Sequence, residues 1–237
     1  MGVPVDGNGL LTVYRVSSSK GSGLWAPSGP AADAAGNIYV TAGNGFSDTS
    51  FDFGNSVLRL SPNLALSDWF APKNWQQLNT ADIDLGSMGP VLLSDGLIFQ
   101  AGKEGKGYLL QMDNLGHIGN EVFSGSIGQG AFGGAAYAPP YIFVPTTNGL
   151  VALLIGSGST FTVLWSSPNF FAGPPVVAGG TVFTVDTGSG ILYAFSEDKG
   201  NIISKISLGP VVHFTSPTLS GGRVFVAAAR QIISLSP

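Results

Sequence analysis

A strand–turn–strand phrase recurs along the chain and constrains its fold more than any other feature. The clearest copy spans residues 180–195: Gly-Thr-Val-Phe-Thr-Val, then Asp-Thr-Gly-Ser-Gly, then Ile-Leu-Tyr-Ala-Phe. The aromatic residue of the first strand returns in five units, as Tyr39, Phe99, Phe143, Phe183 and Phe225. The intervals are about 40 to 44 residues, with the first stretched to about 60. Four short strands in a period of about 40 to 45 residues are typical of a β-propeller blade, so we predict an all-β fold of four-stranded antiparallel blades.

The composition agrees with many short strands joined by tight turns. Glycine accounts for 35 of the 237 residues, 10% of the chain is charged and 44% is hydrophobic. Such a chain can bury a large core, and its few long-chain helix formers favour strands. The net charge of −4, without a basic patch, argues against a nucleic-acid partner. The absence of cysteine excludes disulfides and cysteine-based metal sites.

Neither a targeting signal nor a membrane span is visible in the sequence. Residues 1–6 lack the basic and apolar regions of a signal peptide. No run approaches eighteen consecutive apolar residues, so we expect no transmembrane segment.

We predict a single β-propeller domain over residues 1–237 with about five blades. Full blades are expected at about 29–87, 88–130, 131–170 and 171–210, between partial blades at 1–28 and 211–237. The first partial blade would contribute strands at 10–16 and 23–25. We expect an incomplete or unusually small ring. In the alternative, those first strands complete the last unit and close a five-bladed ring, which removes an unpaired edge.

The repeat also resembles a known family. Within residues 174–195, Pro-x-Val-x-Gly-Gly-x-Val-Phe followed by Gly-x-Leu-Tyr-Ala-Phe is similar to the PQQ-like repeat of quinoprotein-type propellers, relatives of the WD40/YVTN-like repeats. That family contains non-catalytic propellers of the BamB type as well as quinoprotein alcohol dehydrogenases. The resemblance implies a β-propeller and an extracytoplasmic location, whether periplasmic, secreted or at the cell surface. A repeat shared by enzymes and scaffolds is specific for fold and not for function.

Residues 36–45, 55–62 and 82–84 are also similar to a segment of the PQQ-dependent alcohol dehydrogenases. By this resemblance Asp82 would be the catalytic base, and Asn44, Trp75 and Asp84 would contact the cofactor. The loop carboxylates Asp48 and Asp52 are candidate Ca²⁺ ligands, since calcium needs six or more oxygens.

Departures from the enzyme pattern favour a second interpretation. Ala81 stands where these enzymes have Trp, and the chain has no vicinal cysteine pair. Asp and Asn in loops commonly accept hydrogen bonds from nearby backbone N–H groups, which explains the acidic pairs without a cofactor. The only histidines, His117 and His213, lack further ligands for zinc.

We also expect a hairpin turn with solvated charges at residues 102–107.

We therefore favour a non-catalytic binding or scaffold propeller without a cofactor. Its ligand or partner would contact the long loops at residues 43–54 and 72–87, which carry nearly all the extra length beyond the repeat. Trp75, among Asn and Gln residues, would suit a protein or carbohydrate partner. The alternative is a PQQ- and Ca²⁺-dependent dehydrogenase, or a degenerate remnant of one, with Asp82 as base.

Overall fold

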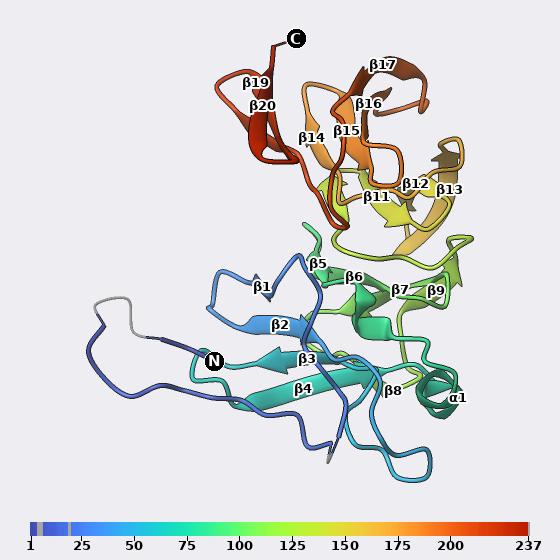
Figure 1. The fold of residues 1–237 in the computed structure, drawn as a ribbon. Coiled ribbons are helices and arrows are strands. Elements are labelled where there is room, and N and C mark those ends of the chain that lie inside the picture. The colour runs from blue at the N-terminus through green and yellow to red at the C-terminus, as the bar shows by residue number, and fades with distance from the viewer. Residues whose placement is uncertain (4–6, 19, 237) are drawn as a thin grey trace. The chain divides into compact units, whose positions relative to one another are not determined.

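The computed structural model describes residues 1–3, 7–18 and 20–236 (Figure 1). The chain divides into two compact units, residues 1–104 with 108–124, and residues 105–107 with 125–237. The described residues are nearly all-β, as the repeat predicts, and their strands form five sheets. Among the described residues, none of the helices has the length and apolarity needed to cross a bilayer.

The first sheet has the order β1-β2-β3-β4-β8. Its strands are β1 (Ala31–Ala32), β2 (Ile38–Thr41), β3 (Val57–Leu60), β4 (Leu66–Ala71) and β8 (His117–Ile118). The pairs are antiparallel except β4 with β8, where Phe70 lies opposite His117 in a parallel register. The second sheet orders β5 (Val91–Leu92), β6 (Leu97–Ala101), β7 (Lys106–Gln111) and β9 (Phe123–Ser126).

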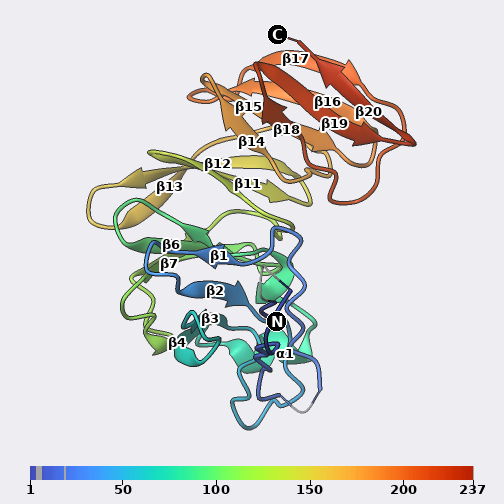
Figure 2. The ribbon, with the colours of Figure 1, turned by 90° about the vertical axis from the view of Figure 1, so that its left-hand side faces the viewer.

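Three further sheets complete the second unit. One consists of β10 (Ala136–Ala138), β11 (Tyr141–Thr146), β12 (Gly149–Gly156) and β13 (Thr160–Ser166). The next consists of β14 (Val176–Ala178), β15 (Thr181–Asp186), β16 (Ile191–Ser196) and β17 (Ile202–Ser207). The last has three strands, β18 (Thr218–Ser220), β19 (Arg223–Ala228) and β20 (Gln231–Leu235). In all three sheets, strands adjacent in the chain are neighbours in the sheet, as in a propeller blade (Figure 2).

Three of the five recurring aromatic residues, Tyr39, Phe99 and Phe143, are buried in the core. Tyr39, from β2, is 1% exposed and packs in one cluster with Ile98 of the second sheet. Phe143, from β11, is fully buried in a cluster with Phe195 of the following sheet. These contacts confirm the interpretation of Tyr39 and Phe143 as core residues between blades, whereas Phe183 and Phe225 are only partly buried.

The prediction of two strands near the N-terminus is wrong. Residues 10–16 and 23–25 form no named strand in the described part of the chain, and only the isolated bridges Gly2 to Thr12 and Gly21 to Gly45 occur there. Tyr14 and Val16 instead pack against the face of the first sheet. Apolar and polar residues do alternate in residues 10–16. The apolar side chains cover the face of a sheet, however, and the backbone does not pair with a sheet edge.

The long insertion after β4 contains a helix that the sequence analysis missed. Helix α1 spans Trp75–Thr80, and a 3₁₀ turn, η1, follows at Leu85–Ser87. Trp75 and Leu78 are its buried residues, three positions apart. One apolar pair in a polar segment is too short a pattern to distinguish a helical turn from a loop.

Candidate functional site

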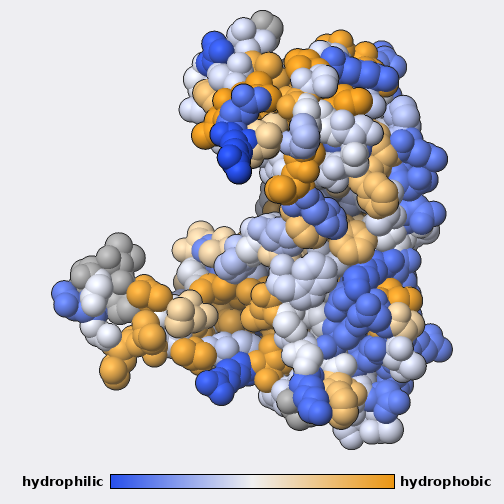
Figure 3. Space-filling model, viewed as in Figure 1, coloured by the Kyte–Doolittle hydropathy of each residue, from blue (hydrophilic) through white to orange (hydrophobic). Residues whose placement is uncertain are grey.

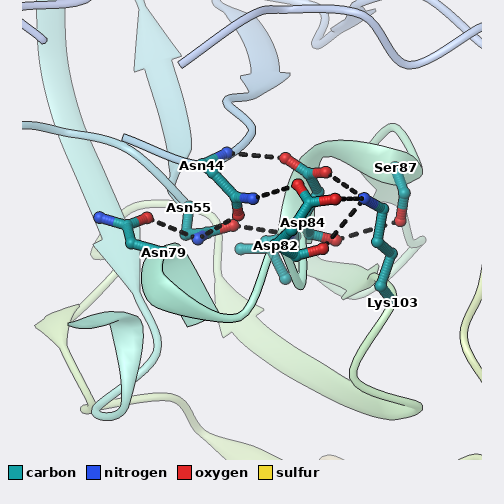
Figure 4. Close-up of polar contacts among 8 residues, drawn as sticks. Asn44, Asn55, Asn79, Asp82, Asp84, Ser87 and Lys103 are labelled. Atoms are coloured by element: carbon teal, nitrogen blue, oxygen red, sulfur yellow. Dashed lines mark hydrogen bonds and ion pairs between the residues drawn. The ribbon is translucent and has the colours of Figure 1, made fainter. Parts of the chain in front are cut away.

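Two long loops of the first unit are joined by a network of side-chain amides (Figure 4). Asn55, just before β3, donates Nδ2 to Oδ1 of Asn44 at 2.9 Å and to Oδ1 of Asn79 at 2.8 Å. Its own Oδ1 accepts from the backbone N–H of Leu85 at 2.7 Å. Asn79, on α1, also accepts from Gly45 N and donates to the carbonyl of Ser47. One buried side chain thus connects the loop at 43–54 to the segment at 72–87.

Asp84 and Lys103 form a shielded ion pair beside this network. Lys103 Nζ lies 2.5 Å from Asp84 Oδ2, and the two side chains are 23% and 11% exposed. Asp84 Oδ1 accepts from the backbone N–H of Asn44 at 2.7 Å. Burial lowers the pKa of Lys103, but the carboxylates of Asp84 and Asp82 more than offset this and raise the pKa above its ordinary value. The charge of Lys103 in the 102–107 turn is therefore paired, which corrects the expectation that it is solvated.

Asp82 lies at the exposed edge of the same cluster. Its side chain is 84% exposed, its Oδ1 accepts from Asn44 Nδ2 at 2.8 Å, and its Oδ2 is 3.5 Å from Lys103 Nζ. Its backbone has a φ of 56°, in the left-handed region that few residues other than glycine adopt. The structure thus brings together three residues singled out from the sequence: Asn44, Asp82 and Asp84.

The two carboxylates of the 43–54 loop lie in different environments. Asp52 Oδ2 accepts from Ser18 Oγ at 2.8 Å and from the backbone N–H groups of Phe46 and Ser47, while Oδ1 accepts from Gly54 N. This is the backbone-satisfying role expected for loop Asp residues. Asp48 is exposed, and its carbonyl accepts from Gln76 Nε2 at 2.9 Å.

Trp75 is buried within a group of aromatic rings. It is 6% exposed and lies edge-on to Phe51, at 5.4 Å between ring centroids. Phe51 stacks on Trp69, which in turn stacks on His117 at 4.6 Å. His117 Nε2 is 3.4 Å from Asp68 Oδ1. The packing of these rings fixes the base of the 43–54 loop.

Several polar groups of this cluster are already engaged within the protein. Both carboxylate oxygens of Asp84 and the side-chain amide of Asn44 already have protein partners. In the described part of the chain, no group of three or more His, Asp or Glu residues converges as a metal site would require. Asp82 as base, the cofactor contacts, and Asp48 and Asp52 as Ca²⁺ ligands stay predictions.

The residues that organise the cluster were not among those selected from the sequence. Asn55, Asn79 and Lys103 come from a strand start, a helix and a hairpin turn. An Asn next to a glycine, as in Gly54-Asn55, does signal a special backbone conformation, and Asn55 has a φ of 46°. No local pattern indicates that Lys103 reaches Asp84.

The architecture defines this chain as a β-propeller protein, built from consecutive antiparallel sheets of mostly four strands. No protein-family model matches the chain, and no curated protein sequence matches it. Among solved structures it is similar to BamB from Moraxella catarrhalis, with a TM-score of 0.62 and 16% identity over 86% of this chain. It is also similar to the β-propeller domain of Cps50 (Swd1) from Myceliophteria thermophila, with a TM-score of 0.60 and 10% identity over 88% of this chain.

The matched structures are longer than this chain. The alignments cover 55% of BamB and 64% of the Cps50 domain. A computationally designed protein, Ika8, matches with a TM-score of 0.54 and 8% identity, over 88% of this chain and 70% of its own. At these identities the similarity establishes the propeller fold alone.

Proposed function

We propose that this protein is a non-catalytic binding propeller of the PQQ-like repeat family that holds a protein partner on the loops at 43–54 and 72–87. The observation that carries the proposal is the Asn55 network, which ties both loops together through a fully buried side chain. Loops held in one conformation lose little conformational entropy on binding, so such a surface favours recognition. The proposal includes an extracytoplasmic location for this protein, by its similarity in repeat and fold to extracytoplasmic propellers.

The exposed part of the loops has the mixed chemistry of a protein contact surface. Phe46 is 65% exposed, and Lys20 Nζ lies 5.2 Å from its ring centroid. Asp82 and Asp48 are exposed on the same pair of loops. Aromatic side chains are enriched at the core of protein interfaces, and polar groups lie around them at the rim. Trp75, the aromatic residue that the sequence suggested for a carbohydrate, is buried and offers no open face.

Partner capture with matched variants tests this proposal. Proteins cross-linked to the purified wild type are identified by mass spectrometry, and their affinity is then measured for Phe46→Ala, Asp82→Ala and Val122→Ala. Val122 is 46% exposed in the same unit and lies outside both loops, so it is the control. We expect a loss of about tenfold or more for Phe46→Ala, a smaller loss for Asp82→Ala and no change for Val122→Ala. A partner that binds all variants with equal affinity would show that these loops are not the contact surface. The wild type is also applied to a glycan array, and binding to glycans with no captured protein would exclude a protein partner.

A separate measurement distinguishes the proposal from the dehydrogenase alternative. Purified protein is mixed with PQQ and Ca²⁺ and then assayed for quinone absorbance and dye-linked alcohol oxidation. We expect neither signal, since the oxygens that would be needed are engaged within the loop network. Stoichiometric quinone binding that is lost in Asp84→Asn would overturn the proposal.

A further inference from the structure

A pocket of about 490 Å³ lies in the second unit, between the sheet that begins with β14 and the sheet that begins with β18. Only the first two strands of each sheet and the turns that connect them line this pocket, so neither β17 nor β20 contributes to it. Strands β14 and β18 lie side by side here (Figure 2). The side chains that meet across the pocket are those of Thr181, Phe183, Leu219 and Val224.

In the preceding sheet, a tyrosine stands at the position of Thr181. Ala138 pairs with Tyr141 at the start of β11, and Ala178 pairs with Thr181 at the start of β15. The two residues therefore have the same register, and each faces the sheet that follows its own. A threonine side chain is much shorter than a tyrosine side chain, so it leaves space that a phenol ring can fill.

The packing of Tyr141 shows that its ring occupies the equivalent space between the two preceding sheets. Tyr141 and Val177 both pack against the core cluster that contains Val182. Val177 pairs with Val182, as Leu219 pairs with Val224 in the next sheet. The pocket beside Thr181 is therefore the space that corresponds to the ring of Tyr141, with the ring missing.

The neighbouring aromatic residue is more exposed where this ring is missing. Phe143 is fully buried, and its ring centroid lies 6.1 Å from that of Tyr141. Phe183, which holds the same position beside Thr181, is only partly buried. A partly exposed aromatic ring in the wall of a pocket offers a surface on which a second ring can stack.

A pocket in the first unit shows the same dependence on this position of the repeat. Asn37 precedes Tyr39 by two residues, as Thr181 precedes Phe183, and a pocket of about 320 Å³ opens beside Asn37. Its charged lining residues are Asp33, Arg59 and Asp113. The two pockets thus occupy equivalent places in the repeat and differ in the charge of their walls.

The side chains that meet in the pocket beside Thr181 are uncharged. Arg223 also lines this pocket, but it alternates with Val224 along β19, so its side chain lies on the opposite face of the sheet. Arg223 Nε donates to Ser234 Oγ at 2.6 Å on that opposite face. Burial of an unpaired charge is costly, and the pocket therefore favours an uncharged ligand.

We propose that the pocket beside Thr181 binds a small, neutral aromatic molecule of about the size of a phenol, whose ring stacks on Phe183 and contacts Leu219 and Val224. The ring takes the place that the side chain of Tyr141 fills between the preceding two sheets. The volume of the pocket lies within the range of small-molecule sites, about 300–1,000 Å³. This site belongs to the second unit and is distinct from the loops at 43–54 and 72–87.

An NMR titration of the full chain with p-cresol, which has the structure of a tyrosine side chain, tests the proposal. We expect saturable binding with a Kd of about 0.1–1 mM. Nuclear Overhauser effects should connect the ring protons of p-cresol to the methyl groups of Leu219 and Val224. Benzoate and benzylammonium are aromatic ions of similar size, and they should bind at least about tenfold more weakly.

Two tyrosine substitutions in the same sheet provide a matched comparison. Thr181→Tyr places a tyrosine side chain in the pocket and should weaken p-cresol binding at least about tenfold. Ser207→Tyr introduces the same side chain at an exposed position of β17 outside the pocket and should leave the affinity unchanged.

Four results would overturn the proposal: no saturable binding of p-cresol up to about 10 mM, contacts only with methyl groups elsewhere, equal binding of the charged probes, or undiminished binding to a folded Thr181→Tyr variant. If Thr181→Tyr does not fold, the contacts between p-cresol and the methyl groups of Leu219 and Val224 in the wild type decide. Each of these outcomes leaves the proposed function of the loops untouched.

Discussion

A single asparagine determines the conformation of the candidate binding surface. Asn55 is fully buried, and its side chain donates two hydrogen bonds and accepts one. Leaving one such buried polar group without a partner costs about 1–3 kcal/mol. Its φ of 46° is tolerated better by Asn than by most residues. Side-chain hydrogen bonding and backbone conformation therefore both favour asparagine at position 55.

The carboxylate of Asp52 should make the stability of the loop depend on pH. Burial raises the pKa of Asp52, but hydrogen bonds from Ser18 and from the backbone of residues 46, 47 and 54 more than offset this and hold the pKa below its ordinary value. A depressed carboxyl pKa contributes stability above the ordinary value of about 4 and loses it as the pH falls through the folded-state value.

Urea denaturation at several pH values checks this expectation. The difference in the free energy of unfolding between wild type and Asp52→Asn should be largest at about pH 6 and shrink below about pH 4. Ser18→Ala removes one of the donors and should reduce the same pH dependence in part. A difference that is constant from pH 6 to the acid limit would contradict this role of Asp52.

At the scale of elements, the sequence specifies the hairpins well because their signals are local. The two strands of the phrase at residues 180–195 are found at Thr181–Asp186 and Ile191–Ser196. Alternating β-branched and aromatic residues between glycine turns are enough to locate such strands.

The elements that escaped prediction depend on distant contacts. Strand β8 has two residues, and its pairing with β4 bridges 47 positions between Phe70 and His117. The candidate site shows the same limit. Its acidic members were found because Asp stands out in loops, whereas Lys103 reaches them only through the folded hairpin. Long-range partners leave no periodic signal in one sequence.

The β16–β17 turn gives an element-scale prediction. Gly200 has a φ of 66°, and a Cβ there would lie 2.5 Å from the ring of Trp165. Gly209 has a φ of 77° with no atom within 4 Å of the corresponding point, so it is a matched control. Gly209→Ala should cost about 1–2 kcal/mol from backbone strain. Gly200→Ala should cost about 2 kcal/mol more because the indole must move. Equal shifts in urea midpoint would show that Trp165 does not press on the turn.

On the scale of the whole molecule, the first and last sheets differ in how their outer faces are covered. Leu58 and Leu60 of the first sheet are buried beneath a cluster that includes Tyr14 and Val16 from the N-terminal segment. The last sheet instead leaves Ile232 76% exposed. The apolar face of a repeat unit needs such a cover, because it is otherwise exposed to water. Apolar side chains of the N-terminal segment also reach the surface (Figure 3).

If the N-terminal segment covers the first sheet, its two packed side chains should matter and its exposed ones should not. We expect Tyr14→Ala with Val16→Ala to lower the free energy of unfolding by about 2–3 kcal/mol, since both bury apolar area. Leu10→Ala with Leu11→Ala removes residues that are 93% and 58% exposed and should change the free energy of unfolding by less than about 0.5 kcal/mol.

The buried hydroxyl of Tyr14 has no hydrogen-bond partner, and burial raises its pKa. Tyr14→Phe should therefore retain or increase stability, because it removes an unsatisfied polar group and keeps the ring. Urea titrations of the three variants measure these free energies of unfolding. Similar losses of stability in the two double variants would mean that the N-terminal segment does not cover the first sheet.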